Sequence, residues 1–283
     1  MDELLSVKVA HRAIAKDGTE KYLVELSDGK RVECVLIKHK RTVCACLSSQ
    51  VGCAMKCAFC ATGRMGFTRN LTADEIVGQF DLMERESGVK ITNVVFMGMG
   101  EPLHNYDNVV AAIRALQKKG LSWQKITVST VGLPEKIRQL GRDVQCKLAL
   151  SLHAPTDELR SGLVPVNARY PLRDVLAACL DFPLRRKSEL MIEYVLLAGV
   201  NDGDEHTREL IALLRQIPFV VVNLIPYNPV EGIGFARPSL ESAEAMKAAL
   251  IKAGFKTFIR TTKGIDASAA CGMLSVKKKV VPA

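Results

Sequence analysis

Six short apolar runs recur along the chain from residue 43 onward, and an amphipathic stretch separates each from the next. The runs are the predicted strands, over residues 43–47, 92–97, 125–129, 147–152, 190–197 and 220–225. Helices are predicted between them, for example over 72–87, where Thr72 and Glu75 form a capping-box pattern, and over 105–119. Strand–helix units of this length imply parallel strands joined by crossovers. The sequence therefore predicts an α/β fold, a partial (β/α)6 barrel more open than the eight-unit version.

The first 41 residues show a different pattern. Tyr22, Val24 and Leu26 occupy alternate positions, as in a strand with one buried face. Asp28 and Gly29 form a pair that favours positive φ in a two-residue hairpin turn, and the return strand is predicted around residues 32–36. We therefore expect a small N-terminal β-hairpin extension over 1–41, the barrel over 42–260 and a C-terminal loop over 261–283.

Polar and glycine-rich segments follow all six predicted strands. They lie at residues 48–60, 98–102, 129–130, 151–155, 199–202 and 226–229. In folds of parallel strands and helices, ligands gather where the strands end at their carboxyl side. Six such segments in phase predict one site at one mouth of the barrel.

Three closely spaced cysteines stand in the first of these segments. Cys53, Cys57 and Cys60 have the spacing C-x3-C-x2-C. Thiolates are preferred ligands for iron–sulfur clusters and zinc, and three ligands would leave one iron of a four-iron cluster open for chemistry. The alternative is a structural zinc site with a fourth ligand from Cys34, Cys44, Cys46 or His104. Zinc sites usually repeat a C-x2-C pair, and this sequence holds only one, so the spacing favours the cluster.

The composition narrows the classes of protein to which the chain can belong. A hydrophobic content of 48% supports a continuous core, and nine bunched cysteines in 283 residues do not resemble a disulfide scaffold. With no apolar signal segment near the start and no run of ~20 apolar residues, we expect a cytoplasmic protein that does not span a membrane. The net charge of +9 favours a polyanionic partner such as RNA.

An open iron needs a chelating co-substrate, and S-adenosylmethionine (SAM) offers an amino group and a carboxylate. Glu101, in the segment after the second strand, is the natural acceptor for its ammonium group. The alternative interpretation of Glu101 is a carboxylate that stabilises a helix N-terminus.

Further motifs carry a resemblance to a known family. The cysteine spacing followed by Gly100-Glu101-Pro102 resembles the radical SAM superfamily. The string from Cys46 to Cys53, then MGMGEP, SLHAP, IPYNP and Ala270-Cys271-Gly272, is similar to the RlmN/Cfr family of RNA adenosine methyltransferases. The similarity runs in order from Val32 to Cys271. It implies a radical SAM barrel, a 4Fe–4S cluster held by the three cysteines of the cluster motif, and SAM as cofactors.

The resemblance also implies roles for residues outside the cluster. One SAM methylates Cys271, and a radical derived from a second SAM takes hydrogen from that methyl, which then joins the adenine. Cys46 would release the product by forming a disulfide with Cys271, and Glu33 would take the proton from the base. Cys44 is an alternative resolving thiol, because it lies on the same face of an extended strand as Cys46. Glu33 has the alternative of being an ordinary exposed hairpin residue.

By the same resemblance, SAM would contact residues in the segments after the strands. These are Gly100, Glu101, Ser129, Ser151, Leu152, His153 and Asn228. His153 has the alternative of a core histidine satisfied by backbone, and Asn228 that of a simple turn residue. The remaining cysteines fall in no matching motif and are interpreted as packing residues: Cys34, Cys146 and Cys179.

The implied substrate is an adenosine in structured ribosomal or transfer RNA, methylated at carbon 2, with carbon 8 as the alternative. A small electron-donor protein and a monomeric state are also expected. Family members carry a helical N-terminal accessory domain of ~80 residues, whereas this sequence begins almost at the predicted hairpin. The basic segment Lys38, Lys40 and Arg41 is a candidate to replace its phosphate contacts.

Two other functions fit part of the sequence. One is a radical SAM enzyme of the same family with a different substrate, and the other is a non-catalytic iron–sulfur protein that binds RNA. Cys46 and Cys271 together argue against the second, because a structural cluster requires neither.

Overall fold

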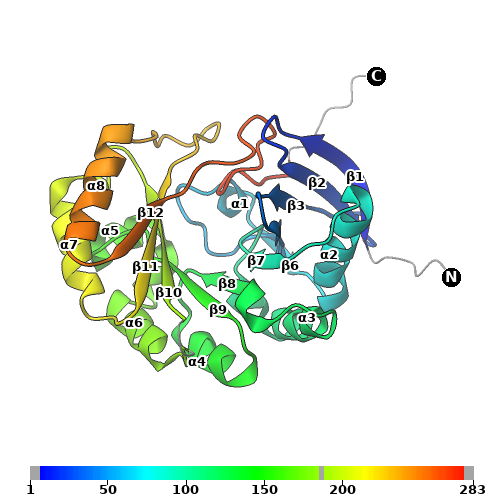
Figure 1. Cartoon of the computed structure of the whole chain (residues 1–283), viewed down its shortest axis with the longest axis horizontal. Helices are drawn as coiled ribbons and strands as arrows, with labels where there is room; N and C mark the ends of the chain where they lie inside the picture. Colours follow the sequence, from blue (N-terminus) through cyan, green and yellow to red (C-terminus); the bar gives the residue numbers. More distant parts are fainter. Residues whose placement is uncertain (1–6, 185–187, 277–283) are drawn as a thin grey trace.

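The computed structural model describes residues 7–184 and 188–276. Ten strands form one sheet in the order β1-β2-β3-β4-β7-β8-β9-β10-β11-β12, and two further strands, β5 and β6, pair with each other (Figure 1). The strands are β1 (Val7–Ile14), β2 (Glu20–Leu26), β3 (Arg31–Lys38), β4 (Val43–Cys46), β5 (Gln50–Gly52), β6 (Phe67–Asn70), β7 (Asn93–Phe96), β8 (Ile126–Thr130), β9 (Lys147–Ser151), β10 (Leu190–Leu196), β11 (Val220–Pro226) and β12 (Lys256–Ile259).

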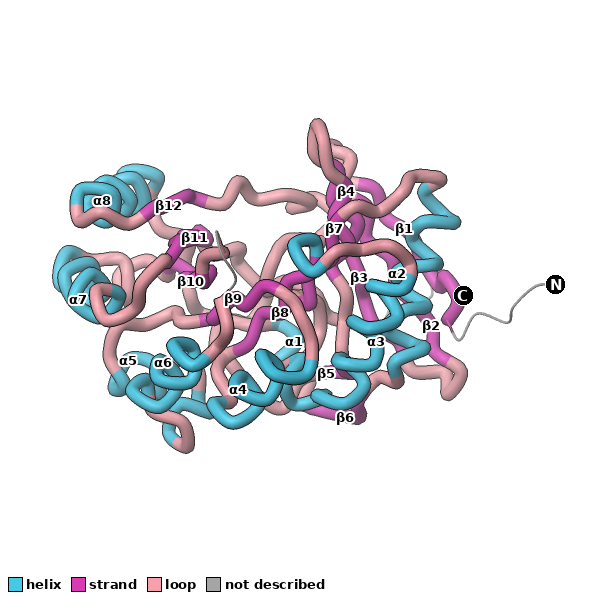
Figure 2. Tube along the Cα trace, turned by 60° about the horizontal axis from the view of Figure 1, so that its bottom comes forward, coloured by secondary structure: helices cyan, strands magenta, loops and turns pink. Residues whose placement is uncertain are grey.

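Except for the four-residue α1, the α-helices line the outside of the curved sheet (Figures 1 and 2). The α-helices are α1 (Ala61–Arg64), α2 (Ala73–Ser87), α3 (Tyr106–Lys118), α4 (Pro134–Asp143), α5 (Asp157–Leu163), α6 (Leu172–Asp181), α7 (Asp204–Leu214) and α8 (Leu240–Lys252). Short 3-10 helices are η1 (Pro102–Asn105), η2 (Trp123–Lys125) and η3 (Pro165–Ala168). The capping box predicted at α2 is present, since Thr72 and Glu75 exchange side-chain-to-backbone hydrogen bonds. Within the described residues, no helix has the length and apolar character needed to cross a membrane.

All six predicted barrel strands are present, as β4 and β7–β11, and they run parallel. The partial α/β barrel is therefore confirmed. A further parallel strand, β12, pairs with β11 and was not predicted. It spans four residues and two of them, Lys256 and Phe258, are exposed, so it lacks the apolar run that marks a buried strand.

The N-terminal extension continues the same sheet. Strands β1, β2 and β3 are antiparallel, and β3 pairs with β4 at the barrel edge. The predicted faces of β2 are correct, because Tyr22, Val24 and Leu26 are buried and the residues between them are only partly so. The prediction of a two-residue turn at Asp28 and Gly29 was wrong. Four residues, 27–30, join β2 to β3, and only Gly29 has a positive φ, of 76°.

Alternation along the parallel strands separates the core from the lumen of the barrel. In β9, Leu148 and Leu150 are fully buried, whereas Ser151, at the carboxyl end, is only partly buried. The outward side chains pack under helices, and the inward ones lie on the lumen side. The carboxyl ends of the strands therefore present polar side chains at a single mouth.

Candidate active site

The three motif cysteines lie in a tight loop between β5 and α1. The loop is fixed by backbone hydrogen bonds from Cys53 N to Gly66 O (2.9 Å) and from Ala58 N to Leu163 O (2.9 Å), and Cys60 is the N-cap of α1. Burial raises the pKa of Cys53 to about 12 and that of Cys57 above its ordinary value, and charge on Cys60 raises both further. Such thiols ionise only beside a compensating positive group, as a metal centre provides.

A four-iron cluster and a single zinc ion make different demands on these three thiols. No three acidic, histidine or cysteine side chains in residues 7–184 and 188–276 are close enough to hold one metal ion. A zinc ion requires four ligand atoms, each within about 2.3 Å of the ion. A four-iron cluster instead binds each thiolate at a separate iron corner. Charge on Cys60 acts on the pKa of both Cys53 and Cys57, so the three thiols lie near one another.

Gly100 and Glu101 follow β7 and are shaped by a close contact with Gln50. Gly100 has φ 101°, and a Cβ there would lie 2.6 Å from Cβ of Gln50. Glu101 is buried, and its carboxylate accepts hydrogen bonds from the backbone N–H groups of Leu103 (3.0 Å) and Val131 (3.0 Å). Burial raises the pKa of Glu101 to about 7. Glu101 thus caps η1, as its alternative interpretation held, and also presents a carboxylate at the mouth.

The next two strands bring further predicted residues together. Ser129 and Ser151 end neighbouring strands, and their hydroxyl oxygens are 3.1 Å apart. Leu152 is fully buried. His153 has φ 64°, its Nδ1 accepts a hydrogen bond from Val195 N (3.1 Å), and burial lowers its pKa to about 3. The ring of His153 is therefore neutral and satisfied by backbone, as its alternative interpretation expected.

The C-terminal segment crosses the mouth and places Cys271 beside the cysteine loop. Ala61 N donates to Gly272 O (2.9 Å), and the hydroxyl of Thr62 donates to Leu274 O (2.7 Å). On the barrel side, Nδ2 of Asn228 donates to Cys271 O (3.3 Å). Cys271, exposed in this structure, is therefore held between α1 and the loop after β11.

Two cysteines of β4 lie within electrostatic reach of Cys271. Cys44 and Cys46 are on the same face of the strand, and the thiol of each interacts with that of Cys271. Burial raises the pKa of Cys46 well above its ordinary value and that of Cys44 to about 11. Both stay candidates for the resolving thiol. Cys34, Cys146 and Cys179 are buried in the core, as predicted for packing residues.

Glu33 is buried in β3, so its interpretation as an exposed hairpin residue was wrong. Its Oε1 forms an ion pair with Lys21 Nζ (3.0 Å), and its Oε2 accepts a hydrogen bond from Ser275 N (2.9 Å). Desolvation by burial raises the pKa of Glu33, and the charge of Lys21 opposes that shift. The alternation of β2 and β3 places these two side chains together, and the C-terminal segment covers them.

Several polar residues that the sequence analysis did not select also shape the site. Arg160 is fully buried and donates to Leu152 O (2.9 Å) and Ser151 O (3.1 Å) at the end of β9. Glu193 is buried in β10, where it accepts a hydrogen bond from Asn223 (2.8 Å). For Glu193 the available signal was a charged residue inside an apolar run, which marks a buried functional or structural group. Arg160 lies in a polar stretch, and its sequence offered no such signal.

The basic segment after β3 is only partly available for a polyanion. Nζ of Lys38 forms an ion pair with the buried carboxylate of Glu20 (2.6 Å), whereas Lys40 and Arg41 are exposed. A cation paired with a buried carboxylate contributes less to attracting phosphate than a free one.

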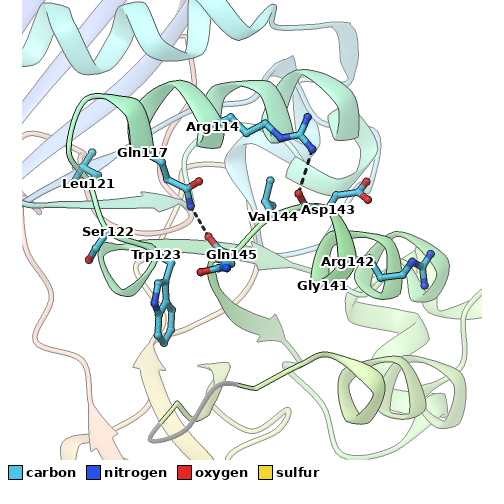
Figure 3. A pocket seen from close by; sticks show the side chains of 10 residues that line it. All are labelled: Arg114, Gln117, Leu121, Ser122, Trp123, Gly141, Arg142, Asp143, Val144 and Gln145. Atoms are coloured by element: carbon cyan, nitrogen blue, oxygen red, sulfur yellow. Dashed lines mark hydrogen bonds between the residues drawn. The ribbon is translucent and has the colours of Figure 1, made fainter.

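A cavity of about 560 Å³ opens at the opposite end of the strands (Figure 3). Arg114 and Gln117 of α3 extend toward the turn before β9, where they donate to Asp143 O (3.2 Å) and Gln145 O (2.8 Å). Because this cavity lies at the amino ends of β8 and β9, it is separate from the mouth that holds the predicted site.

Comparison with known proteins places the chain in a family. Residues 47–211 match the Radical SAM superfamily model. The chain is 44% identical to the probable dual-specificity RNA methyltransferase RlmN of Thermotoga neapolitana, over 99% of this chain and 87% of that protein. It is 48% identical to the RlmN of Geobacter sulfurreducens, over 93% and 73%. A radical SAM methyltransferase from Sphaerobacter thermophilus superposes with a TM-score of 0.92 at 43% identity, covering 96% of this chain and 82% of that one.

These matches confirm the resemblance inferred from the motifs. They establish a SAM-dependent radical methyltransferase whose cofactors are a 4Fe–4S cluster and SAM, so the interpretations as a zinc site and as a non-catalytic protein are not supported. The chain belongs to the RlmN family of dual-specificity RNA methyltransferases, within the radical SAM superfamily.

Proposed function

We propose that this enzyme methylates carbon 2 of an adenine in structured ribosomal or transfer RNA through a methylated Cys271, with carbon 8 as the alternative target. The observation that carries the proposal is the position of the Cys271 segment. It is bonded to the cysteine loop through Ala61 and to Glu33 through Ser275, while the Cys271 thiol interacts with that of Cys46. This arrangement of residues that are far apart in the sequence supports the proposed route.

The residues at the mouth fit both cofactors. Cys53, Cys57 and Cys60 would hold the cluster. Gly100, Glu101, Ser129, Ser151, Leu152, His153 and Asn228 would hold SAM, with Glu101 facing its ammonium group. When bound, these cofactors supply methyl groups and a carbon radical able to remove a hydrogen atom. The protein binds and orients them and shields them from water.

The protein's own thiols and carboxylate would complete the transfer. Cys271 accepts the methyl group on sulfur and presents it to the base. The methyl carbon, once it has lost a hydrogen atom, would bond to the adenine carbon, and the unpaired electron left on this adduct would pass to the cluster. Glu33 takes the proton that the adenine carbon loses, so it must be ionised. Attack of Cys46 on the Cys271 sulfur then breaks the bond from that sulfur to the transferred carbon. The electron pair goes to the carbon, which takes a proton, and a Cys46–Cys271 disulfide remains.

RNA as the substrate is supported by the names of the relatives, which are RNA methyltransferases, and by the net charge of +9. We further propose a cytoplasmic enzyme that acts as a monomer and receives electrons from a small donor protein. Exposed cations, including Lys40 and Arg41 in the turn before β4, would contact phosphate.

The proposal is tested by trapping the covalent RNA–protein adduct. Cys46→Ala should accumulate protein crosslinked to RNA, visible on a denaturing gel, because no thiol can release it. Cys271→Ala should bind the cluster normally, shown by its visible absorption, yet transfer no methyl group. Cys44→Ala is the matched control, two residues along the same strand face, and should release product.

If Cys46→Ala turns over normally and carries no RNA, the proposed covalent route is wrong. Accumulation of the adduct in Cys44→Ala instead would assign the resolving role to Cys44. Mass spectrometry of the modified nucleoside then separates carbon 2 from carbon 8.

A further inference from the structure

A buried ion pair holds the segment that carries Cys271 from the hairpin side. Further from the cysteine, Gly264 N donates to Asp17 (3.0 Å) and Lys16 N donates to Asp266 (2.9 Å). Lys21 Nζ lies 3.0 Å from Glu33 Oε1 and donates to Ser268 O (3.3 Å). Glu33 Oε2 accepts from Ser275 N (2.9 Å). These contacts reach the chain three residues before and four residues after Cys271. The ion pair and the segment therefore form a closed ring around the methyl-accepting cysteine.

The pair is shielded from water, which strengthens it. The side chains of Lys21 and Glu33 are 14% and 7% exposed, and a charge pair held in a low-dielectric setting is screened less than one at the surface. Lys21 reaches this place because β2 pairs directly with β3 in antiparallel register, where Leu23 lies opposite Glu33. A diagonal position two residues away is within reach of a long side chain.

Lys21 is the charged group that acts on Glu33 from a neighbouring element. On the same strand, the Cys34 thiol is buried and senses the charge of Glu33. The loops that pack against Glu33 offer uncharged groups to its backbone: the Ser48 hydroxyl donates to Glu33 O, and the Met99 sulfur accepts from Glu33 N. The ionisation of Glu33 therefore depends on Lys21 more than on any of these contacts.

We propose that Lys21 is a positioning residue that keeps Glu33 ionised and, with it, fixes both ends of the Cys271 segment. This inference rests on the proposed function, in which Glu33 takes the proton from the adenine carbon. Before that step, the ion pair holds Cys271 over the barrel mouth and supplies the anion that the proton transfer needs.

The same ring links proton transfer to release of the segment. When the proton moves from the adenine carbon to an oxygen of Glu33, the carboxyl group becomes neutral and Lys21 loses its counter-charge. The bond from Ser275 N loses its charge assistance at the same moment, and charge-assisted hydrogen bonds are about twice as strong as neutral ones. On the hairpin side, the part of the segment before Cys271 keeps the hydrogen bonds from Gly264 N to Asp17 (3.0 Å) and from Lys16 N to Asp266 (2.9 Å). The part from Cys271 onward is then held through α1 and Asn228, and it can shift toward the resolving thiol.

The test compares Lys21→Met with Lys21→Arg. The rate of single-turnover methylation is measured as a function of pH. In Lys21→Met, the ascending limb of this pH–rate profile should move to higher pH by roughly one unit, because loss of a nearby cation raises the pKa of Glu33. Lys21→Arg should restore the position of the limb. Lys119→Met removes a surface ion pair with Asp81 on the helices outside the barrel and should leave the profile unchanged.

Hydrogen exchange gives a second readout that does not depend on activity. Amide protection over residues 268–276 should fall roughly tenfold in Lys21→Met, and also in Glu33→Gln, which imitates the protonated carboxyl. Lys21→Gln serves in place of Lys21→Met if the latter does not fold.

The outcomes separate this inference from the proposed function. In one outcome, the wild-type enzyme methylates RNA through Cys271 while Lys21→Met has the pH profile and the amide protection of the wild type. That result overturns the role of Lys21 alone. Absence of methylated Cys271 in the wild-type enzyme overturns the proposed function. Hydrogen exchange in the Lys21 variants still shows whether Lys21 and Glu33 hold the segment, because that measurement does not depend on methyl transfer.

Discussion

Arg160 should contribute more to the stability of the barrel mouth than any surface ion pair. Its guanidinium is fully buried and donates to four acceptors, the carbonyl oxygens of Val131, Ser151 and Leu152 and the side chain of Asn167. Burial lowers its pKa to about 10, so it is still charged at neutral pH. The four bonds tie together the carboxyl ends of β8 and β9.

The cost of removing it follows from these bonds. Arg160→Met keeps an apolar stem of similar length and removes every donated bond. At a lower bound of about 1 kcal/mol for each buried acceptor left without its donor, the free energy of unfolding should fall by roughly 4 kcal/mol. That is a large part of the roughly 5–15 kcal/mol that stabilises a typical protein. Because Ser151 and Leu152 are predicted SAM contacts, SAM affinity should also fall.

Urea unfolding of the cluster-free protein, followed by circular dichroism, measures this change from the shift of the midpoint at equal slope. Arg138→Met is the matched control, since Arg138 on α4 forms an exposed ion pair with Asp181 (2.6 Å). The control should change the free energy of unfolding by less than about 1 kcal/mol. If Arg160→Met falls within the same range, the four bonds do not stabilise the mouth and the reasoning is wrong.

Three further predictions concern ligand binding. The pKa of Glu101 is about 7, so its carboxyl group becomes protonated as the pH falls below that value. SAM affinity measured by calorimetry should therefore fall about tenfold per pH unit below 7 and level off above it. A flat profile from pH 6 to 8 would exclude Glu101 as the partner of the SAM ammonium group. Gly100→Ala should fold but lose SAM binding, because residue 100 has a positive φ and the added Cβ would overlap the buried side chain of Gln50. SAM affinity equal to that of the wild type would contradict this prediction. The double variant Lys40→Ala/Arg41→Ala should weaken RNA binding and flatten the dependence of RNA affinity on salt concentration. Lys38→Ala removes a cation that is already paired, so it should change this salt dependence less. Equal salt dependence in the wild type and all variants would exclude this segment from phosphate contact.

Local pattern was enough to predict the barrel. Each parallel strand is a short apolar run, and its position is set by which residues avoid water, a property of the sequence. The capping box at Thr72 was equally local and is present. Strand β12 and the β1 strand were missed because their exposed positions interrupt the apolar pattern.

The sequence alone determined the class of chemistry, since three thiols at fixed spacing and a run of ordered motifs identify a cluster and a family. It could not show how the C-terminal segment lies against the hairpin. Lys21, Glu33 and Ser275 meet only because β2, β3 and a segment more than 200 residues away converge at one edge of the sheet. Likewise, Arg160 becomes important only when the ends of two strands present carbonyl oxygens around it. Contacts of this kind depend on distance in space rather than on spacing in the chain, so they are visible only in the folded molecule.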